Sequence, residues 1–143
     1  MPQRSIQNVI AGKQVVTASQ EMTVTEAAQV MSNAKIGAIL VVEKGTLVGI
    51  FTERDALTRV LAKGLDPAVT SLAKVMTAKP MTASPTLPLG HALHMMYDGG
   101  FRHVPVVDQG RPIGVVSARD ALGDEQCNFE RELLQREDIN EIL

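Results

Sequence analysis

An internal repeat is the feature that most constrains the fold of this chain. When the sequence is compared with itself at an offset of 65 residues, 13 of the 41 positions from Thr17 to Leu57 are identical, without a gap. Thr17-Ala18-Ser19 matches Thr82-Ala83-Ser84, and Arg54-Asp55-Ala56-Leu57 matches Arg119-Asp120-Ala121-Leu122. An open array of stacked repeats needs about three or more copies. Two copies therefore predict a closed pair of similar units.

Each copy shows the same order of predicted elements: short strand, helix, strand, strand, helix. Thr23 and Glu26 have the spacing of a capping box, and apolar residues at helical intervals follow them. The apolar runs 36–42 and 47–51 are separated by Lys44-Gly45 and predict a β-hairpin, after which a helix runs from Thr52 to about residue 62. The second copy repeats this pattern with changes.

Two prolines mark those changes in the second copy. Pro88 replaces the helix-capping Thr23, and Pro105 lies inside a predicted strand, which it places near a sheet edge because proline donates no hydrogen bond. The predicted fold class is α+β, with two tandem β-α-β-β-α units as a pseudo-two-fold pair. We place repeat 1 at residues 8–64, a linker at 65–73, repeat 2 at 74–123 and a helical tail at 124–143.

Composition excludes several classes of protein. A chain of 143 residues with a net charge of −2 lacks the broad basic surface of a general nucleic-acid binder. Cys127 is the only cysteine, which excludes a disulfide framework and a cysteine-rich zinc site. No apolar run is long enough to span a bilayer and no signal peptide follows Met1, so we expect a cytoplasmic protein without a membrane partner.

The residues that point to chemistry form a corner between a strand and a helix in each copy. The first corner is Gly49–Asp55 and the second is Gly114–Asp120. The free N–H groups of a helix start can bind an anion, the carboxylate can accept from both ribose hydroxyls, and the glycine can let a ligand approach the backbone. The alternative is that Thr52 to Asp55 and Ser117 to Asp120 are capping boxes, which need no ligand.

The repeat closed by these corners resembles the CBS (cystathionine β-synthase) domain pair, also called a Bateman module, over about residues 8–122. The resemblance implies two clefts between the units that bind adenosine-containing ligands, with AMP or ATP favoured. It assigns the ribose to Asp55 and Asp120, and ribose or phosphate to Thr52 and Ser117. The backbone that frames the adenine is then predicted at Val16, Thr17, Ile36 and Gly37 in one copy, and at Met81, Thr82, Phe101 and Pro105 in the other.

The two copies differ where charge matters. Arg102 and His103 precede the second strand of repeat 2, where repeat 1 has Gly37 and Ala38. The resemblance implies that basic residues at this point contact phosphate, which arginine can do bidentately, so we expect both to contact phosphate in the cleft that uses Ser117 and Asp120. The alternative for Arg102 is a solvated surface charge. The corner arginines Arg54 and Arg119 complete the predicted ligand-binding set.

The predicted function is a regulatory module, not an enzyme, that binds an adenine nucleotide and passes its occupancy to an unknown effector protein. The resemblance implies a homodimer, and the tail residues Phe129 to Leu143 are expected either to serve that dimer or to cap its rim. The alternative is a structural dimerisation module with empty clefts, and a third, weaker hypothesis is an enzyme that acts on a nucleotide. No metal is expected, because His91, His94 and Asp98 lie on a polar outer helix face.

Overall fold

A β-hairpin forms the centre of each repeat in the computed structural model, which describes residues 4–123 and 131–136. Repeat 1 contains β2 (Ala38–Glu43) and β3 (Thr46–Thr52), and repeat 2 contains β5 (His103–Asp108) and β6 (Arg111–Ser117). The turn residues Lys44-Gly45 and Gln109-Gly110 all have positive φ. This conformation matches the twist of the flanking strands, so the turn signals correctly predicted both hairpins.

The helix before each hairpin covers one face of it. These helices are α2 (Val24–Ala34) and α5 (Leu89–Gly99). Thr23 Oγ1 accepts a hydrogen bond from the Glu26 N–H at 3.2 Å, which confirms the predicted cap of α2. Pro88 precedes α5 without a side-chain cap, and Gly100 ends α5 in the left-handed conformation with φ +72°.

The helix after each hairpin differs between the repeats. The first corner opens α3 (Glu53–Asp55), which continues as a π-helix, η1 (Ala56–Leu61). The second corner opens a 3₁₀ helix, η2 (Ala118–Leu122). A helix was therefore predicted correctly in each place, although neither is a regular α-helix throughout.

The described sheets differ in size, and one proline accounts for the shortened first strand of repeat 2. In repeat 1, β1 (Thr17–Ala18) and β4 (Thr77–Ala78) flank the hairpin in the order β1-β2-β3-β4. The sheet of repeat 2 holds β5 and β6, and its expected short first strand is reduced to one bridge between Ala83 and Val106. In repeat 1 the Leu40 N–H donates to the Val16 carbonyl, whereas the equivalent Pro105 has no N–H to donate.

The first short helix of each copy packs against the other copy. Residues of α1 (Ile6–Ile10) belong to the core of repeat 2, and residues of α4 (Leu72–Val75) belong to the core of repeat 1. The two helices dock alike: the Ile6 N–H donates to the Leu87 carbonyl and the Leu72 N–H donates to the Met22 carbonyl, both at 2.9 Å. The repeats thus exchange equivalent segments.

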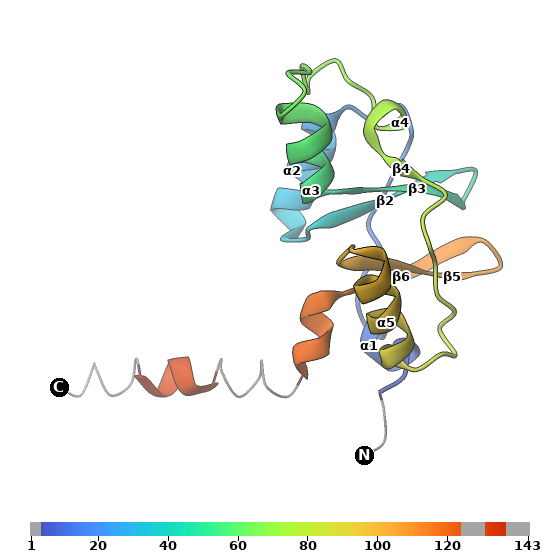
Figure 1. The fold of residues 1–143 in the computed structure, drawn as a ribbon, viewed down its shortest axis with the longest axis vertical. Coiled ribbons are helices and arrows are strands. Elements are labelled where there is room, and N and C mark those ends of the chain that lie inside the picture. Colours follow the sequence, from blue (N-terminus) through green and yellow to red (C-terminus); the bar gives the residue numbers. More distant parts are fainter. Residues whose placement is uncertain (1–3, 124–130, 137–143) are drawn as a thin grey trace.

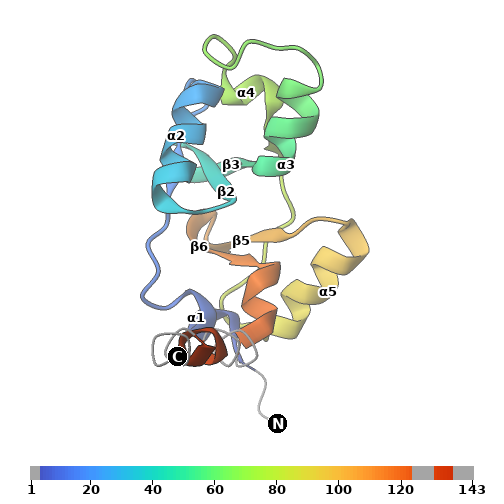
Figure 2. The same ribbon diagram turned by 90° about the vertical axis from the view of Figure 1, so that its left-hand side faces the viewer.

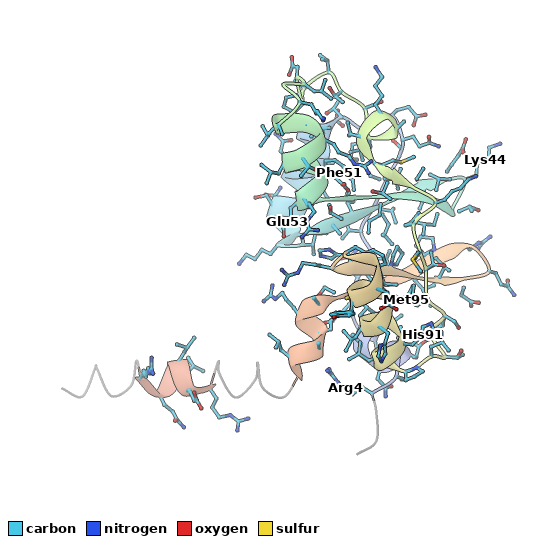
Figure 3. The ribbon with its side chains drawn as sticks, viewed as in Figure 1. Arg4, Lys44, Phe51, Glu53, His91 and Met95 are labelled. Carbon is cyan, nitrogen blue, oxygen red and sulfur yellow. The ribbon has the colours of Figure 1, made fainter. Side chains whose placement is uncertain are left out.

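The two sheets face each other in the middle of the molecule and the helices lie on the outside (Figures 1 and 2). Phe51 is fully buried in the core of repeat 1 (Figure 3). A separate apolar cluster of Ala38, Leu40 and Ile50 packs against Val115 of β6, so it joins the sheets. The Leu47 N–H also donates to the Gly110 carbonyl at 3.0 Å.

Part of the predicted tail is described. Residues 131–136 are helical, and Leu133 and Leu134 are exposed there. Phe129, Ile139 and Ile142, and also Cys127, lie outside the described residues. Among the helices of residues 4–123 and 131–136, none has the length and apolar character that a bilayer crossing requires.

Candidate functional site

A cleft of about 990 Å³ opens between the two repeats at the second corner. Its repeat 1 wall is formed by the segment before β1, the end of α2, the start of β2 and Glu53. Its repeat 2 wall is formed by the start of β5, the middle of β6 and the second corner. The volume is at the upper end of the range for small-molecule sites, and both repeats contribute to the lining.

The two oxygens of the Asp120 carboxylate have different partners, one in the second corner and one in the segment before β1. Oδ2 accepts hydrogen bonds from the Ser117 N–H at 2.7 Å and from Ser117 Oγ at 3.3 Å. Oδ1 pairs with Lys13 Nζ at 2.9 Å. Arg4 Nη2 donates to the Asp120 backbone carbonyl at 2.5 Å, which ties the N-terminal segment to this corner. Asp120 Oδ1 is therefore held by the long side chain of Lys13 and not by a residue of the corner itself.

Both corner aspartates close a capping box, as the alternative reading of the sequence predicted, but the Asp55 carboxylate is engaged entirely within repeat 1. Its Oδ2 accepts from the Thr52 N–H at 3.0 Å and from Thr52 Oγ1 at 3.1 Å, which closes a capping box. Its Oδ1 pairs with Arg59 Nε at 3.4 Å, and Asp55 is only 8% exposed. Asp55 does not line the described cleft. Corners with the same sequence pattern thus differ in what their aspartates face.

The cleft carries more positive than negative charge. Lys13, Lys35, Arg102 and Arg119 line it, against the two carboxylates of Glu53 and Asp120. The chain as a whole has a net charge of −2, so the positive charge is concentrated here. A cleft lined by one sign of charge raises the local concentration of ligands of the opposite sign. The lining therefore favours an anionic ligand.

An acid and an imidazole lie on either side of Gly37 in the cleft, and the acid was not predicted as a site residue. Figure 3 shows Glu53 at the end of α3 nearest to repeat 2. A Cβ on Gly37 would lie 3.1 Å from Glu53 Oε1 and 3.3 Å from His103 Nε2, so the glycine leaves room for both. Burial lowers the pKa of His103, against the opposing effect of the Glu53 carboxylate. In the other copy Ala118 and Ala38 occupy these positions, a sequence difference that could have revealed the pair.

This His103 pKa shift predicts a pH dependence of stability. As pH falls through 6.5, the ordinary histidine pKa, the unfolded chain binds a proton that the folded protein does not yet bind. The free energy of unfolding should therefore decrease between pH 6.5 and the lower pKa of the folded state. Urea unfolding across this range should show the decrease for the native protein and for His91→Gln, which alters an exposed histidine, but less of it for His103→Gln. Parallel profiles for all three proteins would contradict the assignment.

Comparison with known proteins identifies the family. The CBS domain profile matches residues 7–62 and again residues 72–124. The chain belongs to the CBS domain family. The CBS domain-containing protein YhcV of Bacillus subtilis is 36% identical over 115 residues, which cover 80% of this chain and 81% of that protein. The chain spans only 12% of a longer fission-yeast relative and 22% of a plant relative.

Two solved CBS structures with similar folds contain adenosine ligands. The CBS domain pair of protein MJ0100, in complex with 5′-methylthioadenosine and S-adenosyl-L-methionine, has a TM-score of 0.75 and 28% identity, over 84% of this chain and 94% of that one. The CBS domain protein PAE2072 from Pyrobaculum aerophilum, complexed with AMP, has a TM-score of 0.74 and 25% identity, over 81% and 88%. The expected fold class, a mixed α/β CBS pair, is confirmed.

The structure brings part of the predicted binding set into this cleft of the CBS pair. The predicted residues that line the cleft are Val16, Ile36, Gly37, Arg102, His103, Ser117, Arg119 and Asp120. The others lie elsewhere: Arg54 Nη1 donates to the Gly100 carbonyl, Phe101 packs on the core of repeat 2, and Pro105 is buried in β5. Thr17, Met81 and Thr82 are exposed outside the cleft, and Thr52 belongs to the Asp55 capping box.

The glycine of each CBS corner lies against one of the exchanged segments. A Cβ on Gly49 would lie 2.5 Å from Met76 Sδ, and a Cβ on Gly114 would lie 2.7 Å from Ile10 Cγ2. Ile10 ends α1 and Met76 follows α4. The glycines therefore make room for the exchanged segments. The expectation that these glycines let a ligand approach the backbone stays a prediction, and Gly114 lines the cleft.

Proposed function

We propose that this CBS pair is a regulatory, non-enzymatic module that binds an adenine nucleotide in the cleft at Asp120. The observation that carries the proposal is the composition of that one cleft. It combines a carboxylate and a hydroxyl at a helix start, an excess of cations, and apolar backbone segments from the opposite repeat. The AMP complex of one relative and the adenosyl ligands of another support the choice of ligand class.

The lining suggests how the nucleotide lies. Asp120 Oδ1 is placed to accept ribose hydroxyls, since a carboxylate is an acceptor only. Val16 and Ile36 of repeat 1 lie on the other wall and offer apolar surface and backbone groups to the adenine. Arg102 and Arg119 line the same space and can donate to a phosphate with charge-assisted hydrogen bonds.

A nucleotide in this position would touch both repeats at once. It would therefore stabilise one relative orientation of the repeats, to the extent that it binds that orientation better than others. We propose that this change is passed to a partner through a homodimer and an effector protein. The large apolar side chains that the helices leave exposed offer a surface for such contacts: Leu57 and Leu61 on η1, Tyr97 on α5 and Leu122 on η2.

Comparison of the two corner aspartates tests the proposal. We expect Asp120→Ala to weaken AMP binding by roughly tenfold to a hundredfold, because it removes a charged acceptor worth about 1.5–3 kcal/mol. We expect Asp55→Ala to leave AMP affinity within about threefold and to lower stability by about 1–2 kcal/mol, since its carboxylate serves the capping box. Isothermal titration calorimetry and urea unfolding of both variants measure the two effects.

Other outcomes would select the alternatives. If neither AMP, ATP, NADH nor S-adenosylmethionine raises the melting temperature at millimolar concentration, the structural dimerisation module is favoured, since binding to the native state must raise it. Turnover of ATP that Asp120→Ala abolishes while binding persists would favour an enzyme. Equal loss of AMP affinity in both aspartate variants would show that the Asp120 cleft is not the site.

A further inference from the structure

Lys13 lines the cleft from outside the ungapped repeat, which begins at Thr17. It follows α1 and Gly12, in the segment that crosses from repeat 2 to β1 of repeat 1. Its Nζ lies 2.9 Å from Asp120 Oδ1, the carboxylate oxygen that the second corner does not use. The Lys13 side chain is 55% exposed while that of Asp120 is 15% exposed. The ammonium thus covers the acceptor that a ribose would need.

The ion pair can open at low cost. An ion pair that solvent reaches contributes little to stability, because water and salt screen it and the long side chain loses entropy, and the lysine of this pair is more than half exposed. A ribose hydroxyl that donates to Oδ1 can therefore displace the ammonium. The released ammonium then needs a new partner in a cleft that already holds Lys35, Arg102 and Arg119. Ligands differ in whether they supply one.

We infer that Lys13 exchanges its Asp120 partner for a ligand phosphate, and so makes the cleft select 5′-phosphorylated adenosine over uncharged or sulfonium adenosine compounds. This inference rests on the proposed function. A phosphate gives the released ammonium a new anionic partner, so nothing charged is left unpaired. An uncharged adenosine compound leaves Lys13 without its partner, and a sulfonium adds a further positive charge beside four cations.

The test compares AMP, adenosine and S-adenosylmethionine on the native protein and on Lys13→Met, which keeps the length of the side chain and removes its charge. For Lys13→Met we expect AMP affinity to fall by about tenfold, because a charge-assisted contact is lost. We expect adenosine affinity to rise by about twofold to fivefold, because Oδ1 becomes free. Lys74→Met, an exposed lysine of α4 outside the cleft, is the matched control, and Lys13→Arg should keep the preference for AMP.

The outcomes separate this inference from the proposed function. If AMP and adenosine affinities fall equally in Lys13→Met while its melting temperature is native, Lys13 shapes the cleft but does not bind the phosphate, and the inference is wrong. If the native protein binds adenosine as tightly as AMP, the inference about Lys13 is wrong, although the proposed binding of adenosine compounds in this cleft is retained. If neither compound binds the native protein, the proposed function fails and the inference fails with it. Raising the salt concentration should weaken AMP binding and leave adenosine binding unchanged or stronger.

Discussion

Replacing Ile6 with alanine is expected to destabilise the protein by about 2–5 kcal/mol, the range for truncating a large buried aliphatic side chain. Ile6 lies on a helix of only five residues, yet its exposure is 0%. It packs in the core of repeat 2, whose sheet has two strands and one further bridge within residues 4–123.

Urea unfolding of matched variants measures this effect. Leu72→Ala, the equivalent change on α4, should cost a similar amount in repeat 1, since Leu72 also has 0% exposure. Gln7→Ala alters an exposed residue of the same helix α1 and should change the free energy of unfolding by less than about 0.5 kcal/mol. An Ile6→Ala protein as stable as Gln7→Ala would mean that α1 is not docked in repeat 2.

The exchange of α1 also builds the candidate site. Because α1 docks on repeat 2, the chain must return past the boundary between the repeats to reach β1 in repeat 1. The residues on that path, Lys13 to Val16, form part of the repeat 1 wall of the cleft. A single docking event therefore contributes to both the core of repeat 2 and the surface offered to a ligand.

Local signals were sufficient to predict most of the fold. The turns at Lys44-Gly45 and Gln109-Gly110 have both residues at positive φ, the geometry of a two-residue hairpin turn, and the glycines signalled both turns in the sequence. The Thr23 cap set the start of α2, and Pro105 predicted a strand near a sheet edge, where β5 has β6 on one side and the single Ala83 bridge on the other among the described residues. Each of these features depends on residues close together in the sequence, or on one backbone group.

The exchange of short helices could not be predicted in the same way. Apolar residues in Ile6–Ile10 indicate a buried face but not which repeat covers it. The two repeats offer similar docking edges, at Met22 in one and Leu87 in the other. The choice between them depends on contacts distant in sequence, which the pattern of one segment does not contain.

The candidate site shows the same limit. The pattern assigned equal roles to Asp55 and Asp120, because their corners are alike. The difference comes from neighbours: Arg59, one helical turn after Asp55, pairs with it, whereas the equivalent position after Asp120 is Asp124. An i,i+4 pair of this kind is visible in sequence, but Lys13 lies 107 residues from Asp120 and only the fold brings them together.

Replacing Gly114 with alanine is expected to destabilise the protein by about 1–3 kcal/mol, the usual cost of overpacking. The added Cβ would lie 2.8 Å from Ile10 Cβ, an atom next to the backbone of α1 that cannot move without the helix. Gly49→Ala should cost less, since its closest contact is the sulfur of the flexible Met76 side chain. Urea unfolding of the two variants compares the corners directly.

A double-mutant cycle decides why the corner needs a glycine. If Gly114 makes room for α1, Ile10→Ala removes the obstructing atoms, and the Gly114→Ala/Ile10→Ala protein should be more stable than the sum of the single changes predicts, by at least about 0.5 kcal/mol. If Gly114 instead gives a ligand access to the backbone, Gly114→Ala should fold with native stability and lose AMP affinity. Because Gly114 also lines the cleft, AMP titration of the same variants separates the two roles.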